Sequence, residues 1–420
     1  KLAKYLLEHT YSLQLAVAVV EKTDDYSKDY EAINAKMINI KSSMSSGKPL
    51  GAFPFMVVDS ITGAPVVGKS PFEDKYICKE SLLKLKEYKE NKAEENAYEN
   101  LLDNLITQKG DSSFLAVVHI DGNNMGKRIK ELMANKIDYN DAVKTMRAIS
   151  SNLKSAFMYA YQTMDEYIDH RKSDIKPGYD GKLCRKLILA GDDITFICNA
   201  MVALDAVKVF LKSVAEKVMY YDEALSENNN LKKYGLSACA GIAFMNSHFP
   251  FHDAYEVAEE CCASAKGRAK ETECRANGKK DGMIGNYFDF QICNHVKTLE
   301  LDKHREKNYK VSNSKQPIIF RPYYVSCEKY DDLNDINRRN KDIDYEEVLL
   351  KNLSYFCDTS VSRSKMKKLR NAYAMGWEEV DKMLVFLESR ETALPKDTKK
   401  ETWYDALEIM DLYVPDWGEK

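Results

Sequence analysis

The sequence lacks any apolar run long enough to cross a bilayer. The longest one near the N-terminus, residues 13–20, is far shorter than the roughly 20 residues that a membrane-spanning helix needs. No cleavable signal pattern is expected either, and we predict a cytoplasmic protein without a membrane partner. The chain also lacks an excess of one charge, because 62 Lys and Arg residues stand against 65 Asp and Glu residues. This balance argues against a protein that binds nucleic acid by bulk electrostatics.

Clustered cysteines are missing as well. Ten cysteines are scattered along the chain, and no two of them stand in a C-x-x-C pair. A zinc site or a disulfide framework needs such clustering. Several of the cysteines lie inside apolar runs, where a reduced cysteine packs as a small hydrophobic side chain. We therefore expect buried, reduced cysteines.

The 420 residues are enough for two or three domains. Pattern changes predict a small N-terminal α/β domain over 1–92, a charged linker over 93–109, an alternating strand–helix domain over 110–295 and a mainly helical domain over 296–420. The first domain is predicted to hold a strand at 13–20, a helix around 30–43 and paired strands within 53–67. The last is predicted to hold helices at 345–356, 363–389 and 403–413.

The domain over 110–295 carries the clearest pattern. Strands are predicted at 114–120, 185–190, 194–199 and 236–244, and helices at 123–134, 141–169, 201–226 and 253–270. The resulting order β-α-β-β-α-β is the ferredoxin-like split unit. We therefore predict an α+β fold around a ferredoxin-like domain, with a small α/β region before it and a helical region after it.

Carboxylates stand at the ends of neighbouring strands of this unit. Asp121 ends the first strand, and Gly191, Asp192 and Asp193 form the turn between the next two. Adjacent like charges repel and resist desolvation, so an ordinary turn between apolar strands gains nothing from them. Such carboxylates can hold two Mg²⁺ ions for phosphoryl transfer, as in a polymerase or cyclase palm. Side chains alternate along a strand, so both acids face Asp121 only if the turn rotates them, which Gly191 permits.

Two further segments are candidates for binding a triphosphate. The loop of Gly122, Asn123, Asn124 and Gly126 leads from the first strand into a helix, whose N-terminal N–H groups can receive phosphate. The alternative is that the Asn residues only cap this helix. Lys266 lies in a basic run, 266–270, predicted to end the helix after the last strand. It can reach the β- and γ-phosphates, or the run can simply favour the helix dipole.

Four segments in this order resemble the second palm domain of the large polymerase-like subunit of type III CRISPR effector complexes. They are Ile120–Lys127, Leu189–Asp193, Leu236–Ala243 with the following Phe249–Ala258, and Ala263–Lys266. Phe288–Phe290 and Arg321–Tyr323 resemble later segments of the same proteins. The N-terminal region then corresponds to a degenerate palm or to the small preceding domain, whose zinc-knuckle cysteines are missing here. The chain is similar to a compact or standalone relative without a nuclease domain.

The resemblance implies a nucleotidyltransferase that makes a cyclic mono-, di- or oligonucleotide messenger in antiviral defence, with ATP as the favoured substrate. Asp121, Gly122 and Asp192 would bind two Mg²⁺ or Mn²⁺ ions, with Asp193 assisting. Gly122, Asn123, Asn124, Gly126, Gly191 and Lys266 would bind nucleotide. Implied partners are a second palm, in a homodimer or another chain, and RNA or effector-complex subunits.

Three departures from the family pattern keep an alternative open. Ala190 replaces the first Gly of the usual Gly-Gly-Asp-Asp, Asn123 stands where relatives often have Asp, and Cys239 stands where they often have Ser. The alternative is a palm-shaped scaffold that binds nucleotide or RNA without turnover. A template-dependent polymerase is a weaker third hypothesis, because no broad basic channel is evident from the sequence.

Overall fold

The chain forms two compact units, residues 1–100 with 133–145 and residues 101–132 with 146–420. The computed structural model describes residues 2–10, 15–44, 55–59, 62–72, 74–91, 102–107, 113–134, 138–217, 236–277, 285–294, 300–310, 317–327, 340–392 and 394–416. The domain boundaries expected from the sequence, at 92, 109 and 295, stay predictions.

The first unit contains α1 (Leu2–Thr10), α2 (Tyr26–Ser43), α3 (Lys79–Asn91) and an antiparallel pair, β1 (Val66–Lys69) with β2 (Tyr76–Cys78). The strand predicted at 13–20 is wrong for its described part, because residues 15–20 form no strand and pair with no described strand. An alternating pattern favours an extended chain, yet a strand also needs a partner for its backbone groups. Within 53–67, a single bridge joins Val58 to Pro65, while β1 pairs with the later β2.

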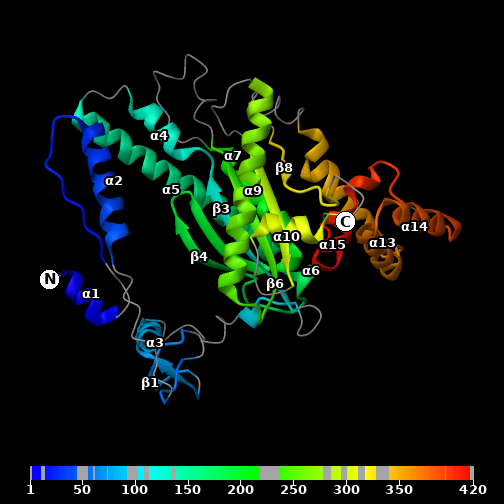
Figure 1. The fold of residues 1–420 in the computed structure, drawn as a ribbon, viewed down its shortest axis with the longest axis horizontal. Coiled ribbons are helices and arrows are strands. Elements are labelled where there is room, and N and C mark those ends of the chain that lie inside the picture. The colour runs from blue at the N-terminus through cyan, green and yellow to red at the C-terminus, as the bar shows by residue number, and fades with distance from the viewer. Residues whose placement is uncertain are drawn as a thin grey trace. The chain divides into compact units, whose positions relative to one another are not determined.

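A six-stranded sheet forms the core of the second unit (Figure 1). Its order is β4-β5-β3-β6-β7-β8, and all neighbours are antiparallel except the parallel pair β6 and β7. The strands are β3 (Phe114–Gly122), β4 (Cys184–Ala190), β5 (Asp193–Asn199), β6 (Ala238–Asn246), β7 (Asn286–Cys293) and β8 (Tyr323–Val325). The first four with their helices make the predicted β-α-β-β-α-β unit, so the ferredoxin-like α+β fold is confirmed.

Helices cover both faces of this sheet. The helices of this part of the chain are α4 (Met125–Met133), α5 (Tyr139–His170), α6 (Lys172–Ile175), α7 (Ala203–Ala215), α9 (Phe251–Asn277) and α10 (Leu301–Asn308). In Figure 1, α9 lies across the front of the strands. Its residues Ala254, Ala258 and Cys261 pack on one face, where Leu115 and Val117 of β3 are buried. Aromatic rings from α5 and α7 pack against the other face, with Phe157 on Phe210 and Tyr161 on Phe196.

Burial on both faces explains the apolar run Phe114–Val118 of β3, since such strands do not alternate with polar residues. Nine of the cysteines are buried and unbridged, so their predicted burial is confirmed. The tenth, Cys274, has no described side chain.

Gly241 sets how closely α9 approaches the sheet. A Cβ added there would lie 1.9 Å from the carbonyl oxygen of Ala258 and 2.4 Å from the amide nitrogen of Cys262, both backbone atoms of α9. We expect Gly241→Ala to lower the free energy of unfolding by about 2–3 kcal/mol, because backbone cannot step aside as a flexible side chain can. Denaturant unfolding measures this loss.

A matched control lies on the same helix. A Cβ added at Gly267 meets no described atom within 4 Å, so Gly267→Ala should raise the free energy of unfolding by up to about 1 kcal/mol through helix propensity. Equal losses for both variants would contradict the close-contact explanation.

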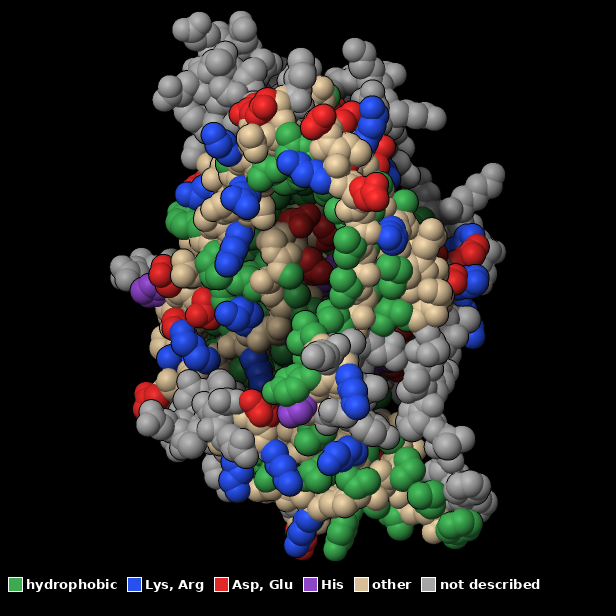
Figure 2. All heavy atoms as spheres, turned by 90° about the vertical axis from the view of Figure 1, so that its left-hand side faces the viewer, with side chains coloured by type: hydrophobic (Ala, Val, Ile, Leu, Met, Phe, Trp, Pro, Cys, Tyr) green, Lys and Arg blue, Asp and Glu red, His purple; other side chains and the backbone are tan. Residues whose placement is uncertain are grey.

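One face of the molecule carries mixed charge. On the face drawn in Figure 2, Lys and Arg side chains stand among acidic and apolar ones. None of the described helices is long and apolar enough to cross a membrane.

The C-terminal part belongs to the same compact unit as the sheet and is mostly helical. Its main helices are α12 (Lys351–Phe356), α13 (Arg363–Met375), α14 (Trp377–Ser389) and α15 (Tyr404–Ile409), with a π-helical turn at 345–350. The single helix predicted over 363–389 is wrong, since it breaks into α13 and α14 at Gly376. The φ of Gly376 is +128°, a conformation that a helix cannot continue through and that glycine tolerates.

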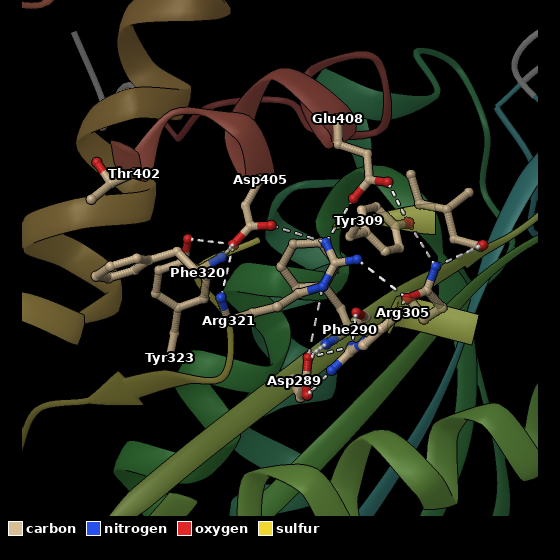
Figure 3. A network of polar contacts seen from close by, with 12 residues as sticks. Asp289, Phe290, Arg305, Tyr309, Phe320, Arg321, Tyr323, Thr402, Asp405 and Glu408 are labelled. Carbon is tan, nitrogen blue, oxygen red and sulfur yellow. Dashed lines mark hydrogen bonds and ion pairs between the residues drawn. The ribbon is translucent and has the colours of Figure 1, made fainter. Parts of the chain in front are cut away.

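A buried network of charges joins this C-terminal part to the sheet (Figure 3). Arg321, whose side chain is fully buried, donates to Asp405 at 3.1 Å and to Glu408 at 2.6 Å, both on α15. Arg305 of α10 makes a two-pronged pair with Asp289 of β7, at 2.7 and 2.8 Å. Buried charges persist only when paired and hydrogen-bonded, so these groups hold β7, α10 and α15 in one arrangement.

Candidate active site

Two of the predicted acids lie side by side at one end of the sheet. Asp121 of β3 and Asp193 of β5 are direct cross-strand partners. Because directly opposite residues of an antiparallel pair share a face, both side chains stand on the face that α9 covers. The register of two apolar strands therefore brings these carboxylates together.

Asp192 completes the group from the hairpin turn. Gly191 has a φ of +71°, which glycine adopts freely and which the tight β4–β5 turn requires. The backbone N–H of Gly122 donates to the carbonyl of Asp192 at 3.3 Å, so the turn is pinned against the end of β3. A Cβ on Gly122 would lie 2.9 Å from Cβ of Asp192, which explains why a glycine follows Asp121.

The pKa of the Asp192 carboxyl reflects its burial and the charges around it. Burial raises its pKa above the usual value, and the negative charges of Asp121 and Asp193 act in the same direction. A backbone hydrogen bond and the positive charge of Lys266 oppose the rise. A partly desolvated acid among other acids binds a cation strongly, because the cation relieves their repulsion.

Lys266 of α9 reaches the same place. Its ammonium group pairs with the Asp121 carboxylate and lies 3.4 Å from the carbonyl oxygen of Gly122. The predicted end of this helix near residue 270 is wrong: α9 continues to Asn277, so Lys266 stands well inside it. A helix-dipole role for Lys266 is therefore unsupported, since that effect is confined to the last turn.

The loop after β3 divides into two parts. Asn123 is fully buried, and its side-chain amide donates to the Ser237 hydroxyl at 3.1 Å and to the Gly285 carbonyl at 2.8 Å. Its backbone N–H donates to the carbonyl of Ser237, so neither group is available to a phosphate in this conformation. Asn124 takes a left-handed conformation, with φ of 57°, and Gly126 is exposed in the first turn of α4. Nucleotide binding by this loop stays a prediction, and it depends on the start of α4 rather than on Asn123.

Asn123→Asp should destabilise this chain. A carboxylate cannot donate to the Gly285 carbonyl, and it would lie buried against an acceptor. We expect a loss of about 1–3 kcal/mol in the free energy of unfolding at pH 7, measured by denaturant titration. Asn124→Asp, at the less buried neighbouring position, is the control. A loss for Asn124→Asp equal to that for Asn123→Asp would contradict this account.

The donor set fits hard divalent cations. Mg²⁺ takes oxygen ligands and is usually held by one or two carboxylates together with substrate phosphates. The Asp121 and Asp192 carboxylates and the Gly122 carbonyl supply such oxygens, and the Lys266 ammonium already lies against two of them as a cation. Among the described residues no three His, Cys, Asp or Glu side chains form a ready-made cluster. Phosphate oxygens would therefore have to complete the coordination.

His119 is a neighbour that the sequence analysis did not single out. Its Nδ1 lies 3.7 Å from Oδ1 of Asp193 and 3.3 Å from the Thr195 hydroxyl. His119 stands two residues before Asp121 on a regular strand. This spacing could have identified it from the sequence, because residues i and i+2 share a face.

Cys239, opposite Asp121 on β6, is fully buried, and burial raises the pKa of its thiol to about 12. It is therefore an inert thiol beneath the site.

Comparison with known proteins agrees with this geometry. Residues 114–275 match the family described as Cas10/Cmr2, second palm domain. The matched stretch begins with β3, ends within α9 and includes every predicted site residue. A search of curated proteins finds no match for the chain. This segment of the chain is therefore a palm domain similar to the second palm domain of the Cas10/Cmr2 family.

Proposed function

We propose that this palm is a metal-dependent nucleotidyltransferase that makes a cyclic mono-, di- or oligonucleotide messenger, with ATP as the favoured substrate. The observation that carries the proposal is the position of Asp121, Asp192 and Asp193 at one end of the sheet. Lys266 pairs there with Asp121, and its charge also acts on Asp192. The reaction joins the 3′-hydroxyl of one nucleotide to the α-phosphate of another and releases pyrophosphate. The likeness of residues 114–275 to the second palm domain of the Cas10/Cmr2 family supports this reaction class.

The position of each residue gives it a separate role in binding metal or phosphate. Asp121, Asp192 and the Gly122 carbonyl would hold two Mg²⁺ or Mn²⁺ ions, with Asp193 assisting. When bound, these ions would lower the pKa of the attacking hydroxyl and neutralise the leaving pyrophosphate. The start of α4, with Gly126 in its first turn, would receive phosphate oxygens through backbone N–H groups. Lys266 would bind the β- and γ-phosphates as a mobile positive charge.

The test is incubation with each of the four nucleoside triphosphates and Mg²⁺ or Mn²⁺. Products are identified by mass spectrometry, and pyrophosphate is measured in parallel. The proposal expects a cyclic product with stoichiometric pyrophosphate, and ATP to be consumed fastest. Binding of nucleotide without any product under all these conditions would contradict it.

A silent scaffold is the second candidate, and it has its own support. The buried amide of Asn123, whose nitrogen donates to Ser237 and Gly285, and the Ala190 replacement remove two features of the usual family motif. Such a palm would bind nucleotide or RNA within a CRISPR-type effector complex without turnover. A template-dependent polymerase would need a broad basic channel, and none is evident from the sequence.

A second palm is the proposed partner, in a homodimer or in another chain. A symmetric cyclic product suits two palms that face one another, each presenting its nucleotide to the other. Size-exclusion chromatography with light scattering tests this. Full activity in a fraction that contains only monomer would contradict it.

A further inference from the structure

Lys266 contacts two oxygens that the proposed function assigns to a metal. Its ammonium group pairs with the Asp121 carboxylate, and its distance to the Gly122 carbonyl oxygen is 3.4 Å. These oxygens come from consecutive residues at the end of β3. A divalent cation bound to both would lie about 2.1 Å from each, which leaves no room for an ammonium group in the same position.

The helix fixes the base of this lysine while its end remains adjustable. Cys262, Ala265 and Ala269 of α9 are buried in a cluster with Cys239 and Tyr287, so the helix cannot turn without breaking that packing. The Lys266 side chain is 25% exposed. A lysine carries its charge on a flexible four-carbon stem, so the ammonium group can leave Asp121 while the backbone stays in place.

We infer that Lys266 is an internal competitor for the divalent cation. Its ammonium group holds Asp121 and the Gly122 carbonyl until a metal–triphosphate complex arrives, and it then moves to the phosphates. The inference rests on the proposed function, because it uses the same metal ligands and the same triphosphate. Its consequence is a site that binds free metal weakly and binds metal together with nucleotide strongly.

The same lysine should therefore act in opposite directions on two ligands. Removing its charge frees Asp121 and Gly122 for metal, and it takes a positive charge away from the phosphates. A residue that merely stabilised the fold would weaken both ligands or neither. This opposition distinguishes competition from a structural role.

The experiment measures binding rather than turnover. Lys266→Met keeps the side-chain length without charge. Free Mn²⁺ is titrated by electron paramagnetic resonance in the absence of nucleotide, and Mg²⁺ with a non-reactive ATP analogue is titrated by calorimetry. We expect Lys266→Met to bind Mn²⁺ about tenfold more tightly and the Mg²⁺–analogue complex about tenfold more weakly than the native chain. Lys266→Gln is measured alongside and should shift both affinities in the same directions.

Lys270→Met is the matched control, because it removes the same charge one turn further along α9 from an exposed position. Both of its affinities should stay within about twofold of native. Mn²⁺ affinity that is unchanged or weaker in Lys266→Met and Lys266→Gln overturns the inference. A native chain that consumes no nucleotide, while Lys266→Met still gains Mn²⁺ affinity, contradicts the proposed function but supports competition at Asp121.

Discussion

Asp192→Asn is expected to lower the rate of pyrophosphate release by about 10³-fold or more. The amide has nearly the same shape as the carboxylate, and the turn is held by the backbone contact between Asp192 and Gly122, so the hairpin should keep its conformation. The substitution removes a negative charge at a partly buried position, where the charges of Asp121, Asp193 and Lys266 act on the Asp192 side chain. The measurement is the initial rate of pyrophosphate release with saturating ATP and Mg²⁺.

Asp381→Asn is the control for a lost acid. Asp381 is exposed on α14 and pairs with Lys400, and exposed pairs contribute little. Its rate should stay within about twofold of native. The same replacement at Asp121 should be as severe as at Asp192, and at Asp193 milder, since Asp193 only assists. Retention of more than about a tenth of the native rate by Asp192→Asn would contradict the two-metal assignment.

Arg321→Met is expected to lower the free energy of unfolding by about 3–5 kcal/mol. Methionine fills much of the volume, but Asp405 and Glu408 would remain buried without their main positive partner. Breaking a buried pair from one side costs more than the pair contributes, because an uncompensated charge is left behind. Chemical denaturation followed by circular dichroism measures the loss.

The loss should depend on pH in a defined direction. Burial raises the pKa of Asp405 above its usual value, and Arg321 opposes that rise. In Arg321→Met the folded-state pKa of Asp405 should rise further. A carboxyl with a raised folded-state pKa destabilises the protein above that pKa and stops doing so as pH falls through it. The deficit of the variant should therefore shrink between pH 7 and pH 4.

Two further variants bound this prediction. Arg321→Met combined with Asp405→Asn should recover part of the loss, because it removes one of the uncompensated charges. Lys382→Met, at an exposed pair with Glu379, should change the free energy of unfolding by less than about 0.5 kcal/mol. A loss below about 1 kcal/mol for Arg321→Met would show that the network does not hold the C-terminal part to the sheet.

The sequence predicted the ferredoxin-like unit well because its signals are local. Strand periodicity and the turn at Gly191 determine the β4–β5 hairpin, and register then places Asp193 opposite Asp121. The break at Gly376 was missed, because an isolated glycine inside a helical pattern does not reveal a positive φ. The strand predicted at 13–20 was wrong for its described part, because strand pairing depends on the whole fold and not on the local pattern alone.

The site was predicted in its residues but not in all its contacts. Nothing in the motif shows that the Asn123 amide turns inward to Ser237 and Gly285, since those partners come from segments more than 100 residues away. The pairing of Lys266 with Asp121 also depends on tertiary structure, because it needs both the length of α9 and its placement over β3.

The contact between Gly241 and α9 has a consequence for the site some distance away. Ala258 and Lys266 are eight residues apart on one helix, which corresponds to about 12 Å of rise. Since backbone touches backbone at Gly241, that point fixes both the height and the rotation of the helix. A slip of one residue there would rotate the lysine by about 100° around the helix axis and away from Asp121. The position of the Lys266 charge in the site is thus set by Gly241, a residue that has no side chain and takes no part in the chemistry.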